Sequence, residues 1–221
     1  MMLIGICMIS NVKVHADYEF KDSSNGFDIF GTMNDLNVPI EKQSQLLEKI
    51  NAGKTLDCDN PLFNIMKPSS VGWDNYGNYT EQYNYPDGSA KRIEITGGQL
   101  LRTTVPASIS DGNYQSSTYW YAWTGAKVSY STVNLSAYFY ADFQGTHDSG
   151  KITNVYDNTF YAIGITVSSE SLTINRANAD SYNPAYATYQ FVKTNSGFSS
   201  TCRLRLFVPK GSSAYANFFT A

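Results

Sequence analysis

The sequence predicts a mainly β protein, an antiparallel β-sandwich of jelly-roll or immunoglobulin-like type preceded by one amphipathic helix. From residue 79 onward, apolar and polar residues alternate in short runs, which is typical of strands with one buried face. Turn residues separate these runs roughly every 8–12 positions, a spacing typical of sandwiches and barrels. The chain lacks the strand–helix–strand alternation that indicates a parallel α/β fold.

The N-terminal residues 1–16 are expected to be a signal peptide, which predicts a secreted protein. Residues 1–9 form an unbroken apolar run, and Val14-His15-Ala16 fits a cleavage site after Ala16. The run is too short to span a bilayer, so we expect no transmembrane segment in the mature chain. No Lys or Arg precedes it, and we therefore expect the true start to lie upstream of Met1. The alternative interpretation is a buried N-terminal strand.

Residues 17–77 are expected to form an N-terminal arm, a helix and a connector. Residues 17–37 predict a loose strand or an extended arm. Residues 40–51 predict the helix, because Pro39 suits a first turn and apolar residues recur on one face. That face comprises Ile40, Leu47 and Ile50, with Leu46 beside it. Residues 54–77 are rich in Asp, Asn, Pro and Gly and predict a polar connector.

Residues 78–221 are expected to form the β-domain. Residues 79–85 alternate, and Pro86-Asp87-Gly88 predicts a hairpin turn into a return strand at 91–95. The clearest strand is 135–143, where small or large apolar residues take every second position. Further strands are expected at 100–105, 151–156, 161–167, 172–174, 185–191 and 202–208.

Two segments of the chain resemble a set of small, uncharacterised secreted proteins of Gram-positive bacteria. The segments are IEKQSQLLEKINAGKTLDCDNP (40–61) and YNYPDGSAKRIEI (83–95). Those proteins have an N-terminal helix, an LDS-x-NP-like connector, a DGS hairpin turn and a C-terminal β-domain. The matching residues are Leu56, Asp57, Asn60, Pro61, Asp87, Gly88 and Ser89, while Cys58 stands where the pattern has Ser. The resemblance implies export and architecture, and no activity.

The composition excludes several classes of protein. Charged residues make up 16% of the chain, against roughly 25% in ordinary globular proteins. The net charge is −3, and 17 residues are tyrosines. These values exclude a coiled coil, a basic nucleic-acid binder and a disordered acidic tail, and they favour an extracellular β-rich protein.

Two cysteines remain after residue 16, Cys58 and Cys202. In an exported protein they could form one disulfide. The other interpretation is a pair of buried free thiols.

The residues available for catalysis are few, and the sequence favours a protein that is not an enzyme. His147 is the one histidine after residue 16, and it lies in a glycine-flanked turn. The sequence has no GxSxG, HExxH or CxxC motif, so we expect no metal and no cofactor. Glu81, Glu94 and Glu170 are the strand-borne carboxylates that a glycosidase could use.

A cluster of oxygen-bearing side chains in the connector raises the possibility of a calcium site. Asp57, Asp59 and Asn60 are the residues concerned. Their spacing lacks the glycine and distal glutamate of an EF-hand, which favours an Asx-rich turn instead.

Aromatic side chains are the strongest functional signal in the sequence. Tyr119, Tyr121 and Trp123 share one strand face, opposite Trp120, and Tyr138 and Tyr140 face away from the predicted core. Such rings could stack on sugars or anchor a protein partner. The alternative is that tyrosines simply cover the sheet, where they fit well.

The leading functional hypothesis is a secreted, non-enzymatic module that binds a cell-surface glycan or protein through these rings. A second hypothesis is a bacteriocin-like or membrane-active toxin, because strands within 128–143 resemble membrane-inserting hairpins. A third is an extracellular glycan hydrolase.

Overall fold

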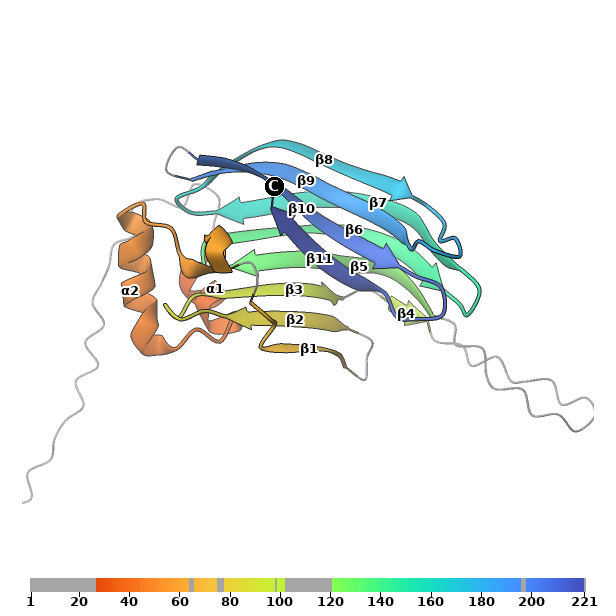
Figure 1. Cartoon of the computed structure of the whole chain (residues 1–221), viewed down its shortest axis with the longest axis horizontal. Helices are drawn as coiled ribbons and strands as arrows, with labels where there is room; N and C mark the ends of the chain where they lie inside the picture. Colours follow the sequence, from red (N-terminus) through yellow and green to blue (C-terminus); the bar gives the residue numbers. More distant parts are fainter. Residues whose placement is uncertain are drawn as a thin grey trace, which may run out of the picture.

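The computed structural model describes residues 27–63, 66–74, 78–97, 99–101, 121–195 and 198–220. Two antiparallel sheets lie face to face, which confirms the predicted β-sandwich (Figure 1). The helices α1 and α2 lie together at one end of the sandwich.

Each sheet is built from strands that follow one another in the chain. The first sheet contains β1 (Ser70–Trp73), β2 (Tyr79–Asn84), β3 (Ala90–Thr96), β4 (Gln99–Leu101), β5 (Tyr121–Thr132), β6 (Leu135–Gly145) and β7 (Gly150–Ala162). The second contains β8 (Thr166–Arg176), β9 (Ala185–Asn195), β10 (Phe198–Val208) and β11 (Tyr215–Thr220). Among the described strands the connectivity is therefore a meander, without the Greek-key crossover of jelly-roll and immunoglobulin-like sandwiches.

The main core lies between the sheets, where the predicted alternation places it. On β6, the residues Ala137, Phe139 and Ala141 are fully buried, and the residues between them face outward. On the facing sheet, the side chains of Tyr189 and Leu204 are equally buried. The period-2 pattern thus assigns the core correctly for these strands.

A second core lies at the helical end and closes the sandwich there. The helix α2 (Ile40–Asn51) has the bounds expected from the sequence, and it buries Leu46, Leu47 and Ile50. Ile40, expected on the same face, is 81% exposed. These side chains pack with residues of α1, the connector and the turn after β5.

The segment expected to be an extended arm contains a helix, α1 (Ile29–Asp35). Asp28 caps it, since its carboxylate accepts a hydrogen bond of 2.8 Å from the backbone N–H of Gly31. Ile29 and Met33 are one helical turn apart and both are buried. The arm prediction was wrong here because Gly31 and Thr32 weaken the helical pattern; residues 17–26 of that arm lie outside the described residues.

Two further expectations differ from the structure. The run 161–167 is not one strand, because β7 ends at Ala162 and Gly164, with φ of +69°, lies in the turn before β8. The connector contains two short 3₁₀ helices, η1 (Asp57–Asp59) and η2 (Pro61–Phe63), and the edge strand β1.

Candidate binding surface

Four tyrosines gather on the outer face of the first sheet, on the side away from the main core. They are Tyr138 and Tyr140 of β6 and Tyr156 and Tyr161 of β7, and all are half-buried. The centroids of the Tyr138 and Tyr140 rings are 5.8 Å apart in an edge-to-face arrangement, and Tyr140 stacks on Tyr156 at 5.9 Å. We call these four residues the tyrosine cluster.

A lysine and contacts between neighbouring rings hold the tyrosine cluster in place. The ammonium of Lys127 on β5 lies 4.1 Å from the centroid of the Tyr138 ring, within cation–π range. The Tyr138 and Tyr161 rings lie with their centroids 6.4 Å apart, and the neighbouring Tyr138 phenol raises the pKa of Tyr161. The cluster is thus a preformed aromatic surface.

A β-bulge on β7 brings the two pairs of tyrosines onto one face. Tyr138 pairs with Thr159 and Tyr140 pairs with Tyr156, so the one residue between them on β6 opposes two residues on β7. Asp157, inside the bulge, takes a positive φ of 51°. Strict alternation would place Tyr156 and Tyr161, five positions apart, on opposite faces, which is why the sequence did not predict that they join the cluster.

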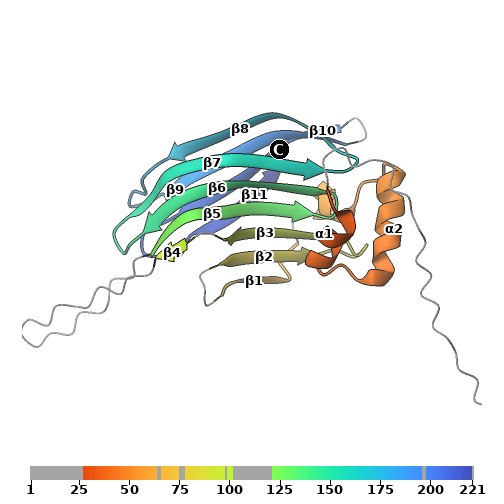
Figure 2. The same ribbon diagram turned by 180° about the vertical axis from the view of Figure 1, so that it is seen from behind.

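A polar groove adjoins the tyrosine cluster on the same face. It has a volume of about 300 Å³ and is lined by residues of α1, β3, β5 and β6. Figure 2 shows α1 at the helical end of these strands. The lining of the groove includes Asp35, Arg92, Glu94, Lys127, Ser131 and Ser136. Arg92 and Glu94 form an ion pair of 3.6 Å, and burial raises the pKa of the Glu94 carboxyl. Lys127 belongs to both features, so the rings and the polar side chains form one continuous surface.

Tyr121 and Trp123, which the sequence predicted to form an aromatic binding face, pack toward the main core instead. Trp123 is 6% exposed and stacks on Phe143 in the main core, so the prediction that it faces a ligand was wrong. Tyr121 packs against the same core, and its hydroxyl donates to the carbonyl of Ser212 at 3.2 Å. These two side chains are inward because β5 pairs with β6 in a register that puts Trp123 opposite the buried Phe143. Tyr119 lies outside the described residues.

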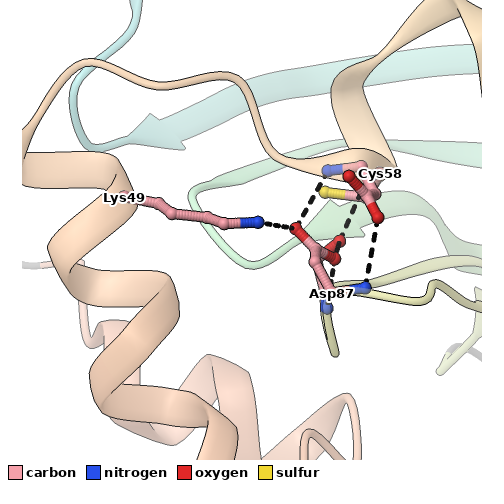
Figure 3. Close-up of polar contacts among 5 residues, drawn as sticks. Lys49, Cys58 and Asp87 are labelled. Carbon is pink, nitrogen blue, oxygen red and sulfur yellow. Dashed lines mark hydrogen bonds and ion pairs between the residues drawn. The ribbon is translucent and has the colours of Figure 1, made fainter.

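Hydrogen bonds join Asp57 and Cys58 of the connector to Asp87 and Ser89 of the hairpin turn, with Lys49 beside them (Figure 3). The Asp87 carboxylate accepts hydrogen bonds from Lys49 Nζ at 3.0 Å and from the Asp57 backbone N–H at 3.1 Å. Asp57 in turn accepts from the Asp87 N–H at 3.1 Å, and the Ser89 hydroxyl accepts from the Cys58 N–H, also at 3.1 Å. Each of these groups has a partner within the chain, so the unit connects the connector to the hairpin turn and serves the fold.

Cys58 and Cys202 are free thiols in the structure, and both are buried, as in the second of the two interpretations above. Burial raises the pKa of Cys58 well above its usual value and that of Cys202 to about 11. Both are therefore protonated at neutral pH and are poor nucleophiles.

The candidate catalytic carboxylates do not come together. Glu81 is on the inner face of the first sheet, where it accepts a hydrogen bond from the Tyr79 hydroxyl at 2.9 Å. Glu94 is on the outer face of that sheet, in the polar groove. Glu170 is on β8 of the second sheet, 3.2 Å from the amide of Asn158. His147 is 75% exposed in its turn, where its ion-pair partner is the still more exposed Asp148.

The oxygen ligands considered for calcium also point to separate partners. Asp57 accepts from Asp87, and Asp59 pairs with Lys193. In the part of the chain that the structure describes, no three acidic, histidine or cysteine side chains come close enough to hold a metal ion. Neither described helix has the length and apolar character to cross a membrane.

Comparison with known proteins gives one distant structural likeness. No family model and no curated protein matches the chain. A solved structure of hypothetical protein lmo2686 from Listeria monocytogenes EGD-e aligns with 64% of this chain and 94% of its own, at 17% identity and a TM-score of 0.37. The relation to secreted proteins of Gram-positive bacteria stays a prediction.

Proposed function

We propose that the chain is a secreted, non-enzymatic module that binds a glycan on a cell surface or in the extracellular space. The observation that supports this most directly is the tyrosine cluster continuing into the polar groove. Sugar rings have apolar C–H faces and hydroxyl-lined edges. A surface with aromatic rings beside charged and hydroxyl side chains complements both parts.

The preformed state of the rings favours binding by this surface. Tyr138 contacts two other rings and the Lys127 ammonium, and Tyr140 is stacked on Tyr156. Rings already fixed by their neighbours lose little conformational entropy when a ligand covers them. The ring contacts alone would also be expected if the tyrosines only covered the sheet surface. The adjoining groove, with its ion pair and serines, adds specific hydrogen-bonding groups.

Export is supported by the apolar N-terminal run and the cleavage pattern ending at Ala16. The protein for binding experiments is therefore the chain that begins at Asp17.

The test is binding of the mature chain to a glycan array and to purified cell-wall polysaccharide, with tyrosine-to-alanine variants. We expect Tyr138→Ala and Tyr140→Ala each to weaken binding about tenfold, the equivalent of roughly 1.4 kcal/mol of lost stacking. Tyr182→Ala is the matched control, because Tyr182 is 95% exposed in a loop of the second sheet. Binding that survives both cluster substitutions, or no glycan binding by the unsubstituted chain, would contradict the proposal.

A further inference from the structure

A second cavity, unrelated to the tyrosine cluster, lies between the two sheets at the helical end. Its volume is about 310 Å³. The strands β3 and β9 contribute side chains from facing sheets, and η1 supplies Cys58 and Asp59. The cavity reaches the surface beside the last strand, where Phe219 and Thr220 line it and are exposed. We call it the seam cavity.

Two lysines occupy inward positions at the seam cavity. On β3, Lys91 follows the alternation that buries Ile93 and Ile95, and on β9, Lys193 follows the alternation that buries Phe191. The pattern of both strands predicts an apolar residue at these positions. Cationic residues in the inner layer of a sandwich are costly to bury, so their presence calls for a partner.

Lys193 has part of its partner in the chain. Its ammonium lies 2.6 Å from Asp59 Oδ1, and the two side chains are only 8% and 3% exposed. The ion pair holds the pKa of Lys193 above its usual value although burial opposes this. A buried ion pair is seldom more stabilising than a pair of apolar side chains of the same size, so stability does not account for it.

The second oxygen of Asp59 is unused. Asp59 Oδ2 is buried and has no hydrogen-bond partner among the described residues. Buried carboxylate oxygens in folded proteins are nearly always satisfied. An acceptor with this burial, on a side chain that lines the cavity, indicates that a donor on a ligand completes it.

Lys91 provides the complementary group. Its ammonium lies 4.2 Å from the centroid of the Tyr83 ring, and no hydrogen bond from it to another described residue is present. Desolvation lowers the pKa of Lys91, so its charge is poorly solvated and gains from an anionic partner. The charged residues that line the cavity are two lysines and one aspartate, so the cavity has a net positive charge.

We propose that the seam cavity binds a small carboxylate that carries a hydroxyl or amino group on the adjacent carbon. The ligand carboxylate accepts hydrogen bonds from the ammonium of Lys91, and the neighbouring hydroxyl or amino group donates to Asp59 Oδ2. A ligand with both groups matches a cavity that offers a cation and an unused acceptor, whereas a neutral sugar or a plain fatty acid matches one of them. This site is independent of glycan binding on the outer sheet.

Three closely related probes test the proposal on the unsubstituted mature chain. Propionate, lactate and alanine share a three-carbon carboxylate skeleton and differ in carrying no donor, a hydroxyl or an ammonium on the second carbon. We expect saturable NMR shift changes at residues of the seam cavity, with a Kd at least tenfold lower for lactate or alanine than for propionate. The stronger of these two shows whether a hydroxy acid or an amino acid is the natural class. Equal binding of propionate, or no saturable change with any probe, would overturn the proposal and leave ordered water as the occupant.

A matched pair of lysine variants locates the binding. Lys91→Met keeps the apolar stem and removes the charge, and it should weaken lactate or alanine binding at least tenfold. Lys151→Met is the control, since Lys151 is exposed on β7 of the same sheet and does not line the seam cavity. Retained affinity in Lys91→Met, with the fold verified by its NMR spectrum, would contradict the assignment. The probe comparison above needs no variant and stands even where Lys91→Met does not fold.

Discussion

At the scale of single residues, Asp87 holds the connector against the hairpin turn. Its carboxylate is 8% exposed and accepts four hydrogen bonds, from Lys49 Nζ, the Asp57 N–H, and the N–H and hydroxyl of Ser89. Burial by itself would raise its pKa, but these hydrogen bonds outweigh burial and hold the pKa of Asp87 below its usual value. We therefore expect Asp87→Asn to lower the free energy of unfolding by about 2–3 kcal/mol, because the amide offers a donor to groups that need an acceptor.

The lowered pKa of Asp87 also predicts how stability depends on pH. A carboxylate with a lower pKa in the folded state stabilises the protein above its unfolded pKa, which is about 3.9. That contribution is lost as the pH falls through the folded pKa. Urea unfolding from pH 7 down to pH 2 should show a steeper acid loss in the unsubstituted chain than in Asp87→Asn. Asp148→Asn, at a side chain that is 90% exposed, should match the unsubstituted chain, and identical acid profiles for all three would refute the role of Asp87.

At the scale of elements, Gly150 sets the distance between the start of β7 and the end of β10. A Cβ on Gly150 would lie 2.2 Å from the backbone oxygen of Val208, which side-chain rotation cannot relieve. Gly150→Ala should thus cost on the order of 2–3 kcal/mol of stability through forced backbone movement. Gly72→Ala on β1 is the control, because a Cβ there meets no atom within 4 Å, and it should change stability by less than about 0.5 kcal/mol. Similar melting temperatures for the two variants would show that the sheets move apart freely.

The elements also show how far sequence reasoning reaches. The period-2 pattern predicts β6, β9 and β10 and their buried residues, because a strand between a core and solvent needs that alternation. It predicts that Tyr138 and Tyr140 face outward for the same reason. It does not predict Tyr156 and Tyr161 as their neighbours, because the bulge at Asp157 shifts the register by one residue. The period-2 pattern does not predict the seam cavity either, because its ion-paired residues Asp59 and Lys193 are 134 positions apart in the chain.

At the scale of the whole molecule, the two cores should unfold together. Cys58 belongs to the core at the helical end and Cys202 to the core between the sheets, so each thiol reports on one of them. The buried Lys193–Asp59 ion pair crosses from one region to the other, and opening one region alone would leave the charge in the other buried without its partner, at considerable cost. Opening of either core alone is therefore unfavourable.

Thiol labelling with residue-level mass spectrometry measures this coupling. We expect both cysteines to resist labelling in the native chain at pH 8, because burial raises their pKa values and excludes the reagent. In increasing urea, Cys58 and Cys202 should become labelled at the same midpoint, as a cooperative two-state transition requires. Labelling of Cys58 at a lower urea concentration than Cys202 would show that the helical end opens independently. Failure of both to label in full denaturant, reversed by a reductant, would identify a disulfide between them, which would supply the link between the cores covalently.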